Sequence, residues 1–157
     1  MLKLEVKNQN IAKMLEKTIK DAKKKEVAIG VLKGSGNYES GESLVDVATT
    51  HEYGSVTKNI PARSFLRTPF YQNQKRVDRI IGLAYKSLVK NTATLDKALN
   101  VIGAECRNIS VESFDDGAGG TWAENKKSTI NAKGSSKPLI DTGKLRQSIQ
   151  WEVRDAT

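Results

Sequence analysis

The feature that most constrains the fold is a regular stripe of apolar residues at helical spacing in residues 95–109. Its members are Leu95, Leu99, Ile102, Cys106 and Ile109. A helix with this pattern has one apolar face, which must pack against other elements of the core. The chain has 157 residues, of which 38% are hydrophobic. Because this is enough for one modest core, we expect a single domain spanning residues 1–157.

Apolar periodicity also predicts the other elements. Helical spacing recurs in residues 11–22, 44–53 and 77–88. The alternation typical of half-buried strands occurs in residues 2–6, 26–32 and 149–153. The resulting order, β-α-β-α-α-α-β, predicts an α+β fold. We expect a small, mostly antiparallel sheet packed by three to four helices.

Glycine, proline and threonine mark the connections. Residues 33–43 and 115–137 show neither period and contain several glycines, so we expect two flexible loops. Gly54 is placed to end the preceding helix in the left-handed conformation. Thr68 and Pro69 look like the N-cap and first residue of the next helix.

The net charge of +8 is distributed unevenly. Residues 26–57 contain one Lys and five acidic residues, whereas residues 58–91 contain eight Lys or Arg and one acidic residue. Residues 1–25 contain eight Lys and three acidic residues. Such segregation can steer a partner of opposite charge, although lysines also simply solvate exposed helix faces.

The N-terminus, MLKLEVK, is not followed by an apolar stretch with a cleavage site. No apolar run approaches the roughly 18–20 residues needed to cross a bilayer. We therefore expect no signal peptide, no membrane contact and a protein that works in the cytosol where it is made. Cys106 is the only cysteine, so we expect a buried, inert thiol on its helix.

The side chains needed for catalysis are scarce. His51 is the only histidine and lies in HEYG, without the second histidine that a zinc-protease helix requires one turn later. One His and one Cys cannot assemble a metal-ligating cluster. No serine lies in a Gly-x-Ser-x-Gly elbow, and no strand leads into a phosphate-binding glycine loop. We therefore expect no enzyme activity, no metal site and no cofactor.

Nucleic-acid binding is a stronger alternative. Basic residues in the central segment are candidates for a strip that contacts phosphates, namely Arg63, Arg67, Lys75, Arg76, Arg79, Lys86 and Lys90. Such contacts give salt-sensitive binding that is independent of sequence. The chain nevertheless shows no helix-turn-helix pair, zinc knuckle or aromatic stacking platform. A non-specific DNA-binding accessory protein therefore remains the main alternative function.

Two segments carry a family resemblance. The first, ATTHEYGSVTKNIPARSFLR, spans residues 48–67; in the second, Trp122, Thr129-Ile130 and a Lys-Gly-Ser turn precede PLIDTGKLRQSI. Together they resemble the tail-completion, or virion morphogenesis, proteins of long-tailed bacteriophages. In that family, His-Glu-aromatic-Gly ends a helix and Ile-Pro-Ala-Arg-x-Phe follows it.

The resemblance implies a structural virion protein that completes the tail or joins it to the head. Its expected partners are further copies of itself in a six-membered ring, and neck, connector and tail-tube proteins. DNA is expected to pass through or near the ring without sequence-specific recognition. The expected location is the virion, after assembly in the host cytoplasm. No sequence feature indicates a third class, a host-directed effector encoded near phage genes.

In such a ring, each subunit contacts its neighbours through two different faces. The acidic segment 26–57 and the basic segment 58–91 are candidates for these faces. We expect Arg63 to pair with an acidic group and Phe65 to fill a pocket. We expect Asp141 and Thr142 to offer side-chain oxygens to the amides of residues 143–145. The candidate interface residues are Arg63, Phe65, Arg67, His51, Glu52, Tyr53, Trp122, Asp141 and Thr142. The alternative is that they only fix the turns of their own subunit.

Overall fold

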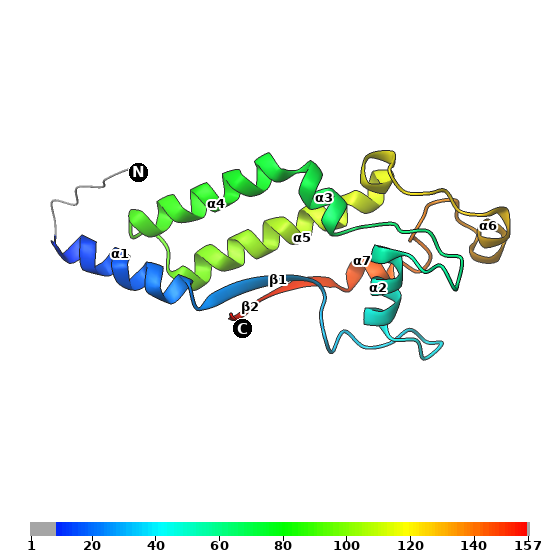
Figure 1. Cartoon of the computed structure of the whole chain (residues 1–157), viewed down its shortest axis with the longest axis horizontal. Coiled ribbons are helices and arrows are strands. Elements are labelled where there is room, and N and C mark those ends of the chain that lie inside the picture. Colours follow the sequence, from blue (N-terminus) through cyan, green and yellow to red (C-terminus); the bar gives the residue numbers. More distant parts are fainter. Residues whose placement is uncertain (1–8, 157) are drawn as a thin grey trace.

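The computed structural model describes residues 9–156 and has the predicted α+β fold (Figure 1). The described residues form seven helices and one two-stranded antiparallel sheet. The elements are α1 (Gln9–Ala22), β1 (Lys25–Val31), α2 (Leu44–Tyr53), α3 (Arg67–Gln72), α4 (Gln74–Val89), α5 (Leu95–Gly120), α6 (Lys127–Lys133), α7 (Lys144–Gln147) and β2 (Ile149–Asp155). The strand predicted at residues 2–6 lies outside the described residues.

Helix α5 organises the molecule, as its apolar stripe predicts. It packs against both strands on one side and against α4 on the other. The sheet pairs Val27 with Val153 and Ile29 with Trp151. The Trp151 ring lies against Gly103 of α5, where a Cβ atom would be only 2.2 Å from the ring. Glycine at this position therefore allows the helix and the sheet to approach closely.

An ion-pair network joins α4 to α5. The Arg76 guanidinium contacts the carboxylates of Glu105 (2.6 Å) and Glu112 (2.5 Å). These two hydrogen bonds raise the pKa of Arg76, and the guanidinium lowers the pKa of Glu112. Arg76 therefore holds two helices of its own subunit together and is not a free cation of the predicted basic strip.

The core lies at the end of the molecule that holds α2, α3 and α7. Phe114 packs against Phe65 and, edge to face, against Trp122, with ring centroids 5.6 Å and 5.2 Å apart. Leu145 and Ile149 complete this cluster from the C-terminal segment. Cys106 is buried on α5, as predicted, and burial raises the pKa of its thiol. None of the helices formed by residues 9–156 is long and apolar enough to cross a membrane.

Two predicted connections were wrong in detail. Residues 115–137 are not one irregular loop, because they contain helix α6, whereas the regular helical geometry of α5 ends before Gly117, close to where the loop was expected to begin. Residues 117–119 have positive φ angles, so the chain leaves the right-handed helix and bends sharply at that point. Helix α3 begins at Arg67, so Thr68 is not its N-cap.

The Thr68 amide donates to the Ser64 hydroxyl (3.0 Å) instead. Pro69 is tolerated within the first turn of α3, where its missing amide would have no helical partner. Gly54 ends α2, as predicted, and its amide donates to the Thr50 carbonyl. Its φ of 78° is positive but its ψ is 172°, so the conformation is not left-handed helical.

Candidate functional site

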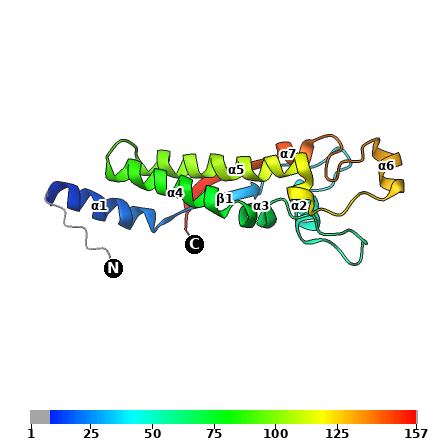
Figure 2. The same ribbon diagram turned by 90° about the horizontal axis from the view of Figure 1, so that it is seen from above.

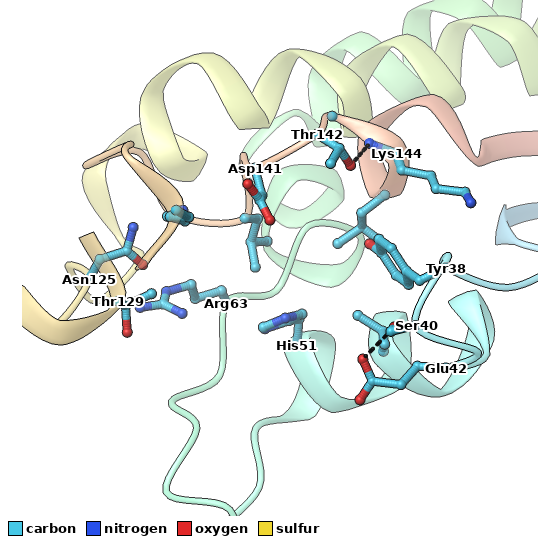
Figure 3. Close-up of a pocket in the computed structure, with 15 residues that line it drawn as sticks. Tyr38, Ser40, Glu42, His51, Arg63, Asn125, Thr129, Asp141, Thr142 and Lys144 are labelled. Carbon is cyan, nitrogen blue, oxygen red and sulfur yellow. Dashed lines mark hydrogen bonds between the residues drawn. The ribbon is translucent and has the colours of Figure 1, made fainter. Parts of the chain in front are cut away.

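The two motif segments meet at the end of the molecule opposite α1 (Figures 1 and 2). Between them lies a cleft of about 340 Å³. Figure 3 shows His51 and Asp141 approaching it from facing sides. Four of the nine candidate residues line this cleft: His51, Arg63, Asp141 and Thr142. Segments about 80 residues apart in the chain therefore form one surface feature.

Glu52 is the structural centre of the first motif. Its side chain is only 4% exposed, and its two oxygens accept five hydrogen bonds. Oε2 accepts from the amides of Phe65 and Leu66 at 2.8 Å and 3.0 Å. Oε1 accepts from the Ser64 hydroxyl, the Arg67 amide and the Arg67 Nε. The carboxylate thus caps the start of α3 from a distant helix, a task usually performed by a local side chain.

Arg63 does not pair with an acidic group, so that expectation was wrong. Its Nε donates to the Ala123 carbonyl at 2.8 Å and its Nη2 to the Glu124 carbonyl at 3.0 Å. The residue is 7% exposed, and burial lowers the pKa of the guanidinium. Backbone carbonyls suffice as partners because they accept the hydrogen bonds that the buried guanidinium requires. Arg63 therefore fastens the first motif to the chain after Trp122.

Phe65 and Trp122 also hold their own subunit together. Phe65 fills a pocket, as expected, but the pocket is the chain's own core, where Phe65 is 1% exposed. The Trp122 Nε1 donates to the Ser64 carbonyl at 3.0 Å, and the Ser110 hydroxyl donates to the Phe65 carbonyl at 2.7 Å. These two residues present little surface to a partner. Their predicted part in an interface stays a prediction.

Four of the candidate residues are exposed. The Arg67 guanidinium lies 4.3 Å from the centre of the Tyr53 ring, and Tyr53 is 64% exposed. This cation–π contact covers the Glu52 network on its solvent side. Thr142 accepts a hydrogen bond from the Lys144 amide (3.3 Å), as expected. Asp141 accepts none from the amides of residues 143–145, so its expected capping role was wrong, and α7 begins after Gly143 with no side-chain cap.

His51 lies half-buried at the floor of the cleft. Its Nδ1 is buried without a hydrogen-bond partner among the described residues. Burial, with Arg63 and Lys133 nearby, lowers the pKa of its imidazole. Because burial and the two cations disfavour a proton on this imidazole, it is a weak base. The described residues contain no group of three His, Cys, Asp or Glu that could hold a metal ion.

Most residues that line the cleft were not among the candidates, and three of them, Tyr38, Lys133 and Lys144, make contacts that shape it. The Lys133 ammonium donates to the carbonyls of Lys137 and Ile140, and so closes the loop that leads into the second motif. The Lys144 ammonium lies over the Tyr38 ring at 5.6 Å and donates to the Asn37 carbonyl. The sequence could have predicted the helix end at Lys133-Gly134, because a basic residue before glycine is typical of a helix C-terminus. No local pattern marks the contact between Lys144 and Tyr38.

Comparisons with protein-family models, with curated proteins and with solved structures find no match to the chain. We therefore infer a function from the residues and their arrangement. That arrangement is a motif region with a mixed-charge cleft at one end and, at the other, α1 with its exposed Lys13, Lys17 and Lys20.

Proposed function

We propose that the chain is a structural subunit of a phage virion, which completes the tail or joins it to the head as one member of a ring. The observation that carries the proposal is the use of the motif side chains. Glu52, Arg63 and Trp122 all bind backbone groups of their own subunit. Side chains used in this way fix the shape of a surface, which is what an assembly subunit requires.

The two ends of the molecule differ in the way that a closed ring requires. A ring of identical subunits needs two different contact faces on each copy. At one end, α1 exposes Lys13, Lys17 and Lys20. At the other, Glu39, Glu42 and Asp46 are exposed and form no ion pair with any described residue. Exposed Lys58 lies beside Glu42 and Asp46, so these acidic groups form a patch on a face of mixed charge. Because opposite charges favour association, attraction between this patch and the lysines of α1 supports the proposal.

Purified protein provides the first test. Native mass spectrometry and negative-stain microscopy should show closed rings, with six copies as the expected number. Association should weaken with added salt, since the contact faces are charged. A protein that stays monomeric at every concentration, alone and with neck or tail proteins, would overturn the proposal.

Virions that lack the protein separate the two roles within the proposal. Full heads and finished but separate tails would identify a joining role. Tails of excessive length would identify a role in ending tail growth. Normal infectious particles would overturn both.

One observation favours DNA binding as the second candidate function. Exposed basic residues lie along α4, namely Lys75, Arg79 and Lys86, and at its C-cap, Lys90. None of them pairs with an acidic group among residues 9–156. Their spacing places all four in one stripe, about 22 Å long. The internal contacts of Arg63, Arg67 and Arg76 remove those residues from the predicted strip.

Duplex binding tests this alternative. If four phosphates are contacted, affinity should fall by about 100-fold between 50 mM and 200 mM salt. A quadruple Lys/Arg→Gln variant of the stripe should then lose the band shift. Absence of a shift at physiological salt, together with rings in the microscope, would exclude DNA binding as the primary function.

A further inference from the structure

Strand β1 has a free edge. Partners in an antiparallel pair exchange backbone hydrogen bonds at every second residue. The Ala156 amide donates to the Lys24 carbonyl at 2.8 Å, which is in register with the pairing of Lys25 and Asp155. The amides and carbonyls that point away from β2 therefore belong to Lys25, Val27, Ile29 and Val31. No other described residue bonds to these outward groups.

This edge adjoins an apolar hollow of about 160 Å³ between β1, α2 and the start of α3. Apolar side chains in its walls include Ile29, Val31, Val45, Ala48 and Leu66. A strand added to a sheet edge gains main-chain hydrogen bonds, and pockets beside the edge accept its alternate side chains. The free edge and the hollow together have the features of such a site.

The edge of β2 is less suitable. The Arg107 Nε donates to the outward carbonyl of Ile149 at 3.1 Å, so a charged side chain already occupies that edge. Natural sheets use charged residues in this way to prevent strand addition. The β1 edge has no such contact along Val27–Val31 among the described residues.

A segment with the right pattern lies outside the described residues. Leu2, Leu4 and Val6 alternate with Lys3, Glu5 and Lys7, which is the pattern of a strand with one apolar face. A segment with this pattern that buries its apolar side chains has to satisfy its backbone groups as well, and a free sheet edge provides the partners. We call residues 2–7 the N-terminal arm.

The arm cannot pair along β1 of its own subunit. Figures 1 and 2 both show α1 running away from the sheet to one end of the molecule. Its 14 residues extend about 21 Å. Residues 1–8, fully extended at about 3.3 Å each, reach about 26 Å. An extended arm that turned back along α1 would reach only about as far as Lys25. Too few of its residues would then remain to lie beside Val27–Val31.

We propose that the N-terminal arm of one copy adds as a third strand to the β1 edge of a second copy. The partner at this edge is therefore another copy of the same chain, with the apolar arm residues facing the core and hollow of the acceptor. Each copy donates at its α1 end and accepts at β1, so the contact is head-to-tail and can close a ring. The inference rests on the proposed ring function, whose subunit contact it specifies.

The test uses the full chain, a variant that lacks residues 1–8, and a fluorescent peptide, MLKLEVKN. Native mass spectrometry should show that the full chain assembles and the truncated variant does not. The peptide should bind the truncated variant in fluorescence anisotropy. A peptide with Leu2, Leu4 and Val6 replaced by lysine is the matched control, and it should bind at least about tenfold more weakly because it loses the apolar face.

Two N-methylated peptides test for strand pairing itself. One is methylated at the amides of residues 2, 4 and 6, and the other at those of residues 3, 5 and 7. Only one edge of the arm faces β1. One peptide should therefore bind like the unmodified arm, and the other should bind at least about tenfold more weakly. Equal binding by both would overturn strand addition.

The outcomes separate this inference from the ring proposal. Rings formed equally well by the full chain and the truncated variant would overturn the arm contact and leave the ring intact. A full chain that never assembles, with a peptide that still binds the truncated variant, would overturn the ring and leave the acceptor site. A peptide that binds neither protein would overturn the acceptor site.

Discussion

Replacing Glu52 by alanine should destabilise the protein severely, although the residue has no catalytic role. The substitution removes the acceptor of five hydrogen bonds. Each bond to a charged acceptor is worth about 1.5–3 kcal/mol, but their losses are not additive. The substitution also leaves the amides of Phe65 and Leu66 without an acceptor, and each unsatisfied buried donor costs about 1–3 kcal/mol, so we expect a total loss of about 3–5 kcal/mol. For a domain of this size, that corresponds to a fall of about 6–20 °C in melting temperature.

Two further variants sharpen the measurement, which is thermal and urea unfolding followed by circular dichroism. Glu52→Gln keeps one acceptor oxygen, so its loss of stability should be smaller than that of Glu52→Ala. Glu39→Ala removes an exposed carboxylate that pairs with no cation among the described residues, and it should change stability by less than about 0.5 kcal/mol. A melting temperature of Glu52→Ala within about 2 °C of that of Glu39→Ala would refute the structural role of the carboxylate.

Three other substitutions test separate features by the same unfolding assay. Gly103→Ala forces a Cβ against the Trp151 ring and should lower the free energy of unfolding by about 1–3 kcal/mol. Gly82→Ala is the control, because its Cβ would enter open space, and it should be neutral or stabilising. Equal effects of the two would contradict the close packing of α5 on the sheet. His51 is the only histidine, and its folded pKa lies below the unfolded value of 6.5. Its contribution to stability is therefore complete above pH 6.5 and is lost as pH falls toward the folded pKa. His51→Gln should remove this part of the pH dependence of stability. An unchanged pH profile in that variant would contradict the lowered pKa of His51. Arg63→Glu should lower stability by about 3 kcal/mol or more, and a variant as stable as the wild type would show that its carbonyl contacts contribute little.

Local apolar periodicity predicted much of the fold because it reports directly on burial. Helix α2 has the bounds expected for it, and each of the two strands in the described residues lies within two residues of its prediction. The start of α3 could not be predicted in this way, because its cap is a carboxylate 15 positions earlier in the chain. The bend at residues 117–119 lies inside the irregular segment expected at residues 115–137, but its conformation was not predicted, since it includes Ala118 at a φ of 54°, which few residues other than glycine adopt.

The sequence located the two motifs, but only four of the nine candidate residues line the cleft between them. Both motifs were identified from sequence, and the structure brings them together around one cleft. The partners of Arg63 are backbone carbonyls, which every residue possesses, so composition cannot reveal them. Sequence also could not show which motif residues point inward.

The distinction between inward and outward residues determines how assembly must be tested. Reversing the charge of Arg63 cannot by itself test a subunit contact, because the buried guanidinium binds its own chain and the variant would lose its fold first. A contact residue should show the opposite behaviour: its substitution leaves the melting temperature unchanged and lowers the assembled mass. Lys17 of α1 is exposed and can be reversed without breaking an ion pair of the described chain. Measuring both quantities for each variant therefore separates the framework that shapes the surface from the surface that binds a neighbour.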